Sequence, residues 1–364
     1  RYNMKNILIA IRSIFKKGRH NVMKIVSLGI GLAVGLVLIA KVYFEQSYDD
    51  FYPDRDRVYQ VWAKYQQNGG ELKDYPQTSG GIAPTMQQQI PEIETVTRYT
   101  SFGDWTFTMT DTKMKYSGRC IIADSCFFDI LPRPMLIGNA KEVLSTPMYV
   151  LISSRIAKNI GGDVIGKNFT VDNSPGRTMT IGGVFEEVPE NSHSRYDVIV
   201  SMASAGRFMW EGSPTNMLGN DRYISYVKLH KGVNPLALEE QVRTFVNSYF
   251  PPEEQQKVGL SIDFSFHKLD NLHKELPQVK RMTWILSLLA FALIFTAVMN
   301  YILIVISSIV NRSKEVAVHK CYGASENNIH GMMFGEALVH IVLSLILALL
   351  LILAFRGTVE AVSY

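Results

Sequence analysis

The chain has 364 residues, of which 47% are hydrophobic and 19% are charged, and its formal net charge is +4. This hydrophobic content excludes a disordered chain, and three cysteines are too few for a disulfide-built scaffold. The positive charge is confined to one end, because residues 1–44 carry eight Lys or Arg and no Asp or Glu, whereas residues 45–283 carry 25 basic and 29 acidic residues. We therefore expect no nucleic-acid partner.

The first predicted element is a short amphipathic helix within residues 1–24. One face carries Ile7, Leu8, Ile11, Ile14 and Phe15 at helical spacing. The basic side chains on its other faces are Lys5, Arg12, Lys16 and Lys17. A basic amphipathic helix directly before a membrane span is expected to lie along the inner membrane surface, in contact with lipid. A polybasic anchor without regular structure is the alternative.

Three apolar stretches are long enough to cross a bilayer, which takes about 20 residues. Their uncharged or nearly uncharged cores are Ile25–Phe44, Trp284–Val310 and Ala337–Phe355. We assign them to spans at residues 25–44, 284–310 and 332–355, because a helix of a soluble protein rarely runs so far without a charge. No small-residue cleavage site follows the first stretch, so it is not predicted to be a removable signal peptide.

The basic residues ahead of the first span predict a cytoplasmic N-terminus. Residues 45–283 are then expected to lie outside, residues 311–331 to return to the cytoplasm, and residues 356–364 to emerge outside. The outer segment is predicted to be a mixed α+β domain. Its predicted strands are Arg57–Lys64, Trp105–Thr110 and Met114–Gly118, and its predicted helices are Ala83–Ile90 and Leu236–Tyr249. Candidate core residues of the last helix are Leu236, Val242, Phe245, Val246 and Tyr249.

Catalytic motifs are weak in this domain. The sequence Gly161–Asn168 is close to a phosphate-binding loop, but Asn168 replaces the hydroxyl that holds magnesium, and the residues after it are typical of a strand rather than a helix. Ser192-His193-Ser194 places hydroxyl groups beside an imidazole, which a simple loop also explains.

The sequence does not predict a metal site or a disulfide bond. His267 and His273 lack further ligands to complete a metal site, so we expect surface positions for both. Cys120 and Cys126 are expected to be ordinary buried thiols, and a bridge between them is the alternative.

The segment between the second and third spans, residues 311–331, is too short for a signalling domain. Charged residues crowd its first half, Gly323 is a candidate helix C-cap, and Ser325 is a candidate cap for the next helix. We expect a small helix at the membrane face that contacts a protein partner. A loop that only joins the two spans is the alternative.

This segment resembles a known motif. Arg312-Ser-Lys-Glu315-Val316-Ala-Val-His319-Lys320-Cys-Tyr-Gly323-Ala324-Ser325 is similar to the R-x-x-E-[VI]-G-x-[RL]-[RK]-x-x-G-A motif of MacB/FtsX-type ABC transporter permeases, from which it departs at Ala317 and His319. Further stretches similar to that family are Tyr48–Tyr59, Asp124–Phe128, Gly166–Lys167, Ile181–Phe185 and Val188–His193, together with Gly138 and Asn300.

The resemblance implies an α+β membrane protein with α-helical transmembrane spans and a mixed α/β periplasmic core domain. That domain is expected to have a Porter-like part and a Sabre-like insertion at about residues 120–221. The loop at 311–331 is expected to be a coupling helix that docks on a cytoplasmic ABC ATPase. The residues expected to contact the ATPase or shape this helix are Arg312, Glu315, Val316, His319, Lys320, Gly323, Ala324 and Ser325. A fourth span of the family pattern is not found after residue 355, and this chain is expected to be a first half.

The resulting hypothesis is a non-catalytic, multi-pass permease subunit of the inner membrane. It is expected to couple ATP hydrolysis in a separate subunit to movement of the periplasmic domain, for efflux or export. ATP and magnesium are expected in the ATPase and no cofactor in this chain. Further expected partners are a second permease half or an identical copy, and a periplasmic adaptor or cargo. The alternatives are a periplasmic sensor or receptor, a mechanical regulator without transport, and a membrane-anchored enzyme.

Overall fold

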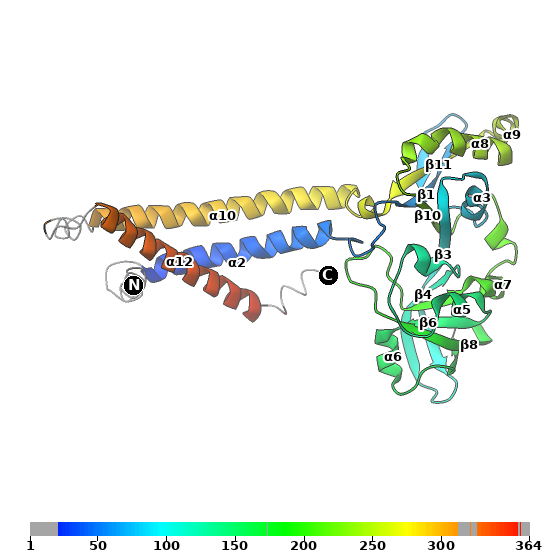
Figure 1. Cartoon of the computed structure of the whole chain (residues 1–364), viewed down its shortest axis with the longest axis horizontal. Coiled ribbons are helices and arrows are strands. Elements are labelled where there is room, and N and C mark those ends of the chain that lie inside the picture. The colour runs from blue at the N-terminus through cyan, green and yellow to red at the C-terminus, as the bar shows by residue number, and fades with distance from the viewer. Residues whose placement is uncertain (1–20, 173, 312–320, 322–325, 356, 358–364) are drawn as a thin grey trace. The chain divides into compact units, whose positions relative to one another are not determined.

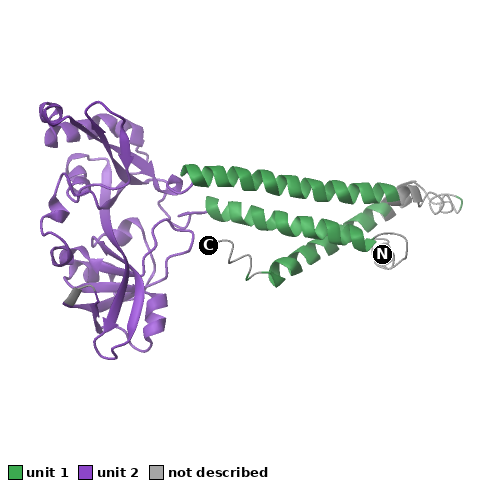
Figure 2. Cartoon of the chain, turned by 180° about the vertical axis from the view of Figure 1, so that it is seen from behind, with its two compact units in different colours: residues 1–46, 276–364 green, residues 47–275 purple. Residues whose placement is uncertain are grey.

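The computed structural model describes residues 21–172, 174–311, 321, 326–355 and 357. The chain divides into two compact units (Figure 2): a helical unit of residues 1–46 and 276–364, and a mixed unit of residues 47–275. The helical unit therefore takes the two ends of the chain, whereas the mixed unit is one continuous segment between them. This division agrees with the predicted fold class, an α+β protein with apolar helices flanking a mixed domain.

The helical unit contains three described helices that are long and apolar enough to cross a membrane. They are α2 (Asn21–Gln46), α10 (Pro277–Asn311) and α12 (Glu326–Ala354). Each contains most of one predicted span, and α10 begins earlier than predicted, so residues 277–283 belong to this helix. Helix α2 packs against both α10 and α12 (Figure 1), which makes it the central helix of the unit.

Glycines on α2 bring the three helices close together. A Cβ atom added to Gly31 would lie 2.3 Å from the Cβ of Ala297 on α10, and one added to Gly35 would lie 2.5 Å from Cγ1 of Ile294. On the side of α12, a Cβ at Gly29 would lie 2.9 Å from Leu347. Small residues permit this approach, and van der Waals contact between backbones is a main source of helix association in a bilayer.

The mixed unit is built on a sheet of eleven described strands. The order along the sheet is β11-β1-β10-β3-β4-β9-β6-β8-β5, with β2 beside β1 and with β7 beside β3 and β8. Most neighbours are antiparallel, and the parallel pairs are β4 with β9 and β6 with β8. The strands are β1 (Val58–Gln67), β2 (Lys73–Tyr75), β3 (Ile93–Met109), β4 (Lys115–Ala123), β5 (Met135–Ile137), β6 (Tyr149–Ser153), β7 (Asn168–Val171), β8 (Ser174–Phe185), β9 (Val198–Ser201), β10 (Ile224–Leu229) and β11 (Leu260–Lys268).

Short helices cover this sheet and complete three apolar clusters. The helices are α3 (Ile82–Gln89), α4 (Phe127–Ile130), α5 (Ala140–Ser145), α6 (Ser154–Ile160), α7 (Ala205–Phe208), α8 (Glu239–Tyr249) and α9 (Pro252–Val258), with 3-10 turns η1 (Met202–Ser204), η2 (Ser213–Thr215), η3 (Pro235–Leu238) and η4 (Leu269–Asn271). One cluster joins α3 and α8 to β1, β10 and β11, through residues such as Met86 and Phe245. A second lies around Phe127 and Phe185, and a third around Phe107 and Phe169.

The sheet is continuous across the start of the expected insertion, because β4 pairs with β3 on one side and with β9 on the other. The structure differs from the prediction for the last helix of this unit. Leu236 is not a core residue, since its side chain is 71% exposed. The reason is that Pro235 begins the 3-10 turn η3 rather than the α-helix, which changes the direction in which Leu236 points. Val242, Phe245 and Val246 are buried as predicted, whereas Tyr249 is 39% exposed.

Candidate functional site

A buried polar network, which we call the junction, joins four segments of the mixed unit. Its members are Asp49, Ser192, His193, Ser194, Tyr99 and Tyr226. Asp49 follows α2 directly in the chain, Ser192 to Ser194 lie in the loop between β8 and β9, and the tyrosines stand on β3 and β10. The junction therefore brings together residues that lie more than 140 positions apart in the chain.

Asp49 and His193 form the centre of the junction. The His193 Nδ1 atom lies 2.6 Å from Asp49 Oδ2, and the hydroxyl of Ser192 donates to Asp49 Oδ1 at 2.9 Å. The side chain of Asp49 is only 1% exposed, so these contacts compensate for the loss of water around its carboxylate. The backbone φ angle of Asp49 is 59°, in the left-handed region that Asp tolerates better than most residues.

Neutral tyrosines extend the network on the other side of the imidazole. His193 Nε2 lies 2.6 Å from the hydroxyl of Tyr226 and 3.2 Å from that of Ser194, which is in turn 2.7 Å from the hydroxyl of Tyr99. Burial raises the pKa of Tyr99 to about 12 and raises that of Tyr226 well above its usual value. Both phenols therefore keep their protons at neutral pH and remain available as hydrogen-bond donors.

Hydrogen bonds of the backbone also join the segment after α2 to the loop between β8 and β9. The amide of Asp49 donates to the carbonyl oxygen of Asn191 at 2.9 Å, and the Asn191 side chain returns a hydrogen bond to the carbonyl oxygen of Ser47 at 2.8 Å. The loop at residues 191–194 is therefore fixed to the segment that leaves α2 by main-chain and side-chain bonds together. Two of the stretches that resemble the permease family, Tyr48–Tyr59 and Val188–His193, meet here.

The segment that leads into α10 reaches the same region. The ring of His273 stacks on Tyr48, with centroids 3.4 Å apart, and the Lys274 ammonium donates to Asp50 Oδ1 at 3.2 Å. The residues just after α2 and those just before α10 are thus held to one another within the mixed unit. The two chain segments that connect this unit to helices are linked by side-chain contacts.

Asp49, His193 and Ser194 are hydrogen-bonded in the same order as the acid, base and nucleophile of a hydrolytic triad. The serine, however, is not accessible to a substrate. A nucleophilic serine must meet its substrate, and Ser194 is 5% exposed and shares its hydroxyl with Tyr99. The explanation of Ser192-His193-Ser194 as a loop is confirmed, and the structure adds that this loop is part of a buried hydrogen-bond network. Sequence reasoning missed it because Asp49 lies 144 positions away from His193.

The other candidates from the sequence have structural roles in the described part of the chain. The strand predicted after the phosphate-loop lookalike is confirmed as β7, which begins at Asn168. His267 is half-buried against Trp62, with ring centroids 4.1 Å apart, and burial lowers its pKa. Cys120 and Cys126 are free thiols whose pKa values are raised by burial. Among the described residues, no three His, Cys, Asp or Glu side chains gather to hold a metal ion.

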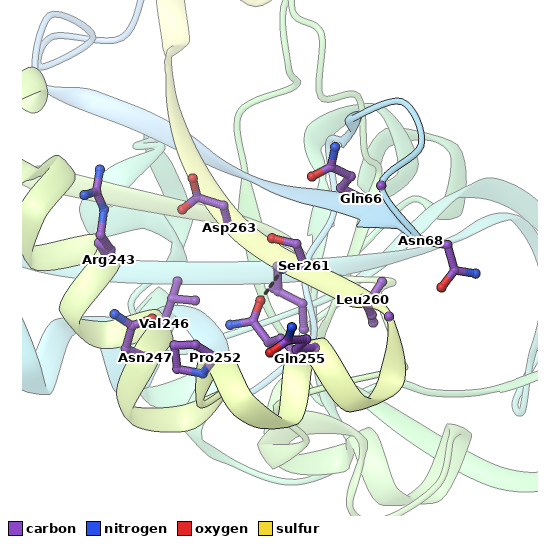
Figure 3. Close-up of a pocket in the computed structure, with 14 residues that line it drawn as sticks. Gln66, Asn68, Arg243, Val246, Asn247, Pro252, Gln255, Leu260, Ser261 and Asp263 are labelled. Carbon is purple, nitrogen blue, oxygen red and sulfur yellow. Dashed lines mark hydrogen bonds between the residues drawn. The ribbon is translucent and has the colours of Figure 1, made fainter.

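A polar pocket of about 530 Å³ lies between α8, α9 and β11 (Figure 3). Gln255 fixes its floor, because its side-chain oxygen accepts from the amide of Ile262 at 2.9 Å and its nitrogen donates to the carbonyl of Phe250 at 2.6 Å. Arg243 and Asp263 supply its charged groups. The pocket contains no pairing of a nucleophile with a base, so its chemistry does not indicate catalysis.

The residues predicted to contact an ATPase or the lipid surface lie outside the described residues. The first group is Arg312, Glu315, Val316, His319, Lys320, Gly323, Ala324 and Ser325. The second group is Lys5, Arg12, Lys16 and Lys17. These assignments remain predictions from the sequence. Cys321, between residues of the first group, is described and exposed.

Comparison with known families gives two matches that together cover most of the chain. Residues 23–245 match the MacB-like periplasmic core domain, and residues 287–363 match the FtsX-like permease C-terminal domain. A comparison with curated proteins gives no match.

Solved structures of similar domains include three bacterial examples. A domain assigned to a permease protein of Porphyromonas gingivalis is 33% identical, with a TM-score of 0.55, over 60% of this chain and 91% of that one. The periplasmic region of MacB from Actinobacillus actinomycetemcomitans is 14% identical (TM-score 0.39), covering 57% of this chain and 87% of that one. The extracellular domain of the noncanonic ABC-type transporter YknZ from Gram-positive bacteria is 11% identical (TM-score 0.39), covering 56% and 98%.

Proposed function

Because the chain belongs to the MacB/FtsX-type ABC transporter permeases, we propose that it converts ATP hydrolysis by a separate cytoplasmic ATPase into movement of its mixed unit. Members of this family are permease components and are not themselves catalytic. The proposal places the mixed unit in the periplasm, the helices in the inner membrane, and the N-terminus in the cytoplasm. It assigns ATP and magnesium to the ATPase and efflux or export of a substrate to the assembly.

The observation that supports this proposal best is the junction. A mechanical coupling device needs the chain segments that leave two spans to be bonded to the body that they move. Ser47 to Asp50 follow α2, His273 and Lys274 precede α10, and both segments bond to each other, while Asp49 bonds to His193. A displacement of either helix would thus be passed into β3 and β10, through Tyr99 and Tyr226, rather than absorbed by a free linker.

The second part of the proposal assigns residues 312–325 to the ATPase contact. We expect Glu315→Lys to weaken ATPase binding by about fivefold or less, because an exposed charge pair contributes only about 0.2–1 kcal/mol. Ala324→Trp is expected to weaken it by at least about tenfold, because solvent does not relieve a steric clash. Co-purification with the ATPase and ATPase activity in membranes measure both effects.

Lys231→Glu is the matched control for this experiment, since it reverses an exposed charge in the mixed unit and is expected to leave ATPase binding unchanged. The thermal midpoint of the mixed unit should be the same in all three variants. Full ATPase binding and activity in both Glu315→Lys and Ala324→Trp would refute the assignment of this loop as the coupling element.

The proposed orientation makes Cys321 accessible from the cytoplasm only. In a Cys126→Ser background, which removes a partly buried thiol of the mixed unit, a membrane-impermeant maleimide should leave intact cells unlabelled and should label Cys321 once the membrane is permeabilised. Cys120 is fully buried, so it should stay unlabelled in both cases, and Cys321→Ser identifies the reactive site. Labelling of Cys321 in intact cells would invert the topology and remove the basis for an ATPase contact at this loop.

A further inference from the structure

The segment between α7 and β10 exposes a tryptophan beside a polar hollow. Trp210 is 64% exposed, and the adjoining cavity has a volume of about 390 Å³, within the usual range of small-ligand pockets. This Trp210 hollow is lined by Met209, Trp210, Ser213, Asn216, Gly219, Asn220 and Arg222. A large aromatic ring left in water retains the free energy that its burial would release, and beside this hollow it is available to a bound ligand.

The segment that bears Trp210 is fixed rather than loose. The Arg98 guanidinium donates to the carbonyl oxygens of Gly80 and Pro214 and pairs with Asp124 at 3.2 Å. The amide of Gly81 donates to the carbonyl oxygen of Asn216 at 2.7 Å. Glycine is required at position 81, because an added Cβ would lie 2.6 Å from the Thr215 oxygen. The hollow is therefore pre-organised, which lowers the entropy cost of binding a ligand.

The indole of Trp210 has a defined position as well. A Cβ atom added to Gly212 would lie 2.4 Å from Cζ2 of the ring, so the ring rests directly on the backbone of Gly212. Close contact on one side, together with 64% exposure, leaves an aromatic surface open to solvent. Such a surface favours contact with C–H groups that carry partial positive charge.

The polar side chains of the hollow are arranged by hydrogen bonds among themselves. The Asn220 nitrogen donates to the hydroxyl of Ser213 at 2.6 Å, and the Nε of Arg222 donates to the Asn220 oxygen at 3.0 Å. The Asn216 nitrogen donates to the carbonyl oxygen of Leu218 at 2.6 Å. Within the described part of the chain, the Nη atoms of Arg222 and the side-chain oxygen of Asn216 have no hydrogen-bond partner, which leaves donors and an acceptor for a ligand.

We propose that the Trp210 hollow binds a pyranose ring of a saccharide. A pyranose presents C–H groups on one face and hydroxyl groups around its edge. An aromatic surface next to planar amide and guanidinium groups is complementary to both. The hollow supplies both within about 390 Å³. A protein partner would need a broader surface, about 800 Å² on each side, and Leu218 is the one other large apolar residue of residues 202–223 that is described as exposed.

Isothermal titration calorimetry on the full chain tests this proposal, in a detergent without a sugar headgroup. The ligands are maltotriose, cellotriose and N,N′,N″-triacetylchitotriose, which differ in linkage and in the N-acetyl group. At least one of them should bind saturably at millimolar concentration. Trp210→Ala should weaken that binding by at least about tenfold, and Trp210→Phe, which keeps an aromatic face, should weaken it less.

Leu236→Ala is the matched control, because Leu236 is an apolar side chain of similar exposure elsewhere in the mixed unit. It should leave saccharide binding unchanged, and all variants should keep the thermal midpoint of the parent chain. The proposal is overturned if none of the three ligands binds up to about 10 mM, or if Trp210→Ala leaves their binding intact. Loss of a protein partner from Trp210→Ala, without saccharide binding by the parent, would also overturn it and would assign Trp210 to protein docking. None of these outcomes depends on the ATPase contact.

Discussion

Replacing Asp49 by alanine is expected to lower the free energy of unfolding of the mixed unit by about 2–5 kcal/mol, because each buried hydrogen-bond partner left unsatisfied costs about 1–3 kcal/mol. The carboxylate is 1% exposed and accepts from both Ser192 and His193. Its loss leaves a hydroxyl and an imidazole buried without their partner. Alanine also fits poorly at a φ angle of 59°, which adds to the cost.

Thermal unfolding of the full chain measures this effect. A domain of 150–250 residues loses about 2–4 °C per kcal/mol, so the midpoint of the mixed unit should fall by roughly 10 °C. Asp49→Asn keeps the volume, one acceptor and the tolerance of the left-handed backbone, and should cost about 1–3 kcal/mol. Asp56→Ala removes an exposed carboxylate from the same segment and should change stability by no more than about 0.5 kcal/mol. Equal midpoints for Asp49→Ala and Asp56→Ala would show that the junction does not stabilise the fold.

Gly31→Leu is expected to separate α2 from α10 and to disrupt the helical unit. The Cβ of the new side chain would lie 2.3 Å from the Cβ of Ala297, well inside van der Waals contact. Overpacking of one methyl group already costs about 1–3 kcal/mol, so Gly31→Ala should be clearly destabilising and Gly31→Leu more so. A bilayer offers little compensation, because helices there associate mainly through close packing.

Resistance to unfolding by sodium dodecyl sulfate, followed by limited proteolysis of the full chain, measures the association of the helices. Gly335→Ala on α12 is the matched control, since an added Cβ there meets no atom within 4 Å. It should be neutral or stabilise the helix by up to about 1 kcal/mol. A Gly31→Leu variant as resistant as Gly335→Ala would contradict the close approach of α2 and α10.

Local patterns predicted the elements of this chain better than their assembly. Uncharged stretches located the three apolar helices, and alternation located β1, because these signals depend only on neighbouring residues. The error at Leu236 is also local, since a 3-10 turn and an α-helix share the proline start but place the next side chain differently. The continuity of the sheet through β4 and β9 was not predictable from periodicity, because register between distant strands leaves no mark on either strand alone.

The junction was beyond prediction for a related reason. Asp49 and His193 are each unremarkable in their own segments, and only the fold brings Asp49 to His193 at 2.6 Å. The available signal was the resemblance itself, since both segments carry family-like residues although they are far apart in the chain. Two segments that both resemble the family, but that are far apart in the chain and have no evident function on their own, are candidates for contact with each other.

The pairing of β1 has a consequence for synthesis. Apart from the short β2, its partners are β10 and β11, which end at Leu229 and Lys268. When the ribosome has made β1, more than half of the mixed unit must still be translated before that strand acquires its neighbours. Until then β1 keeps open edges, which attract other chains, and pairing across such separations is slow. The last partner, β11, is complete only at Lys268, shortly before α10 begins at Pro277, so we expect the nascent chain to need protection from aggregation while the intervening residues are translated.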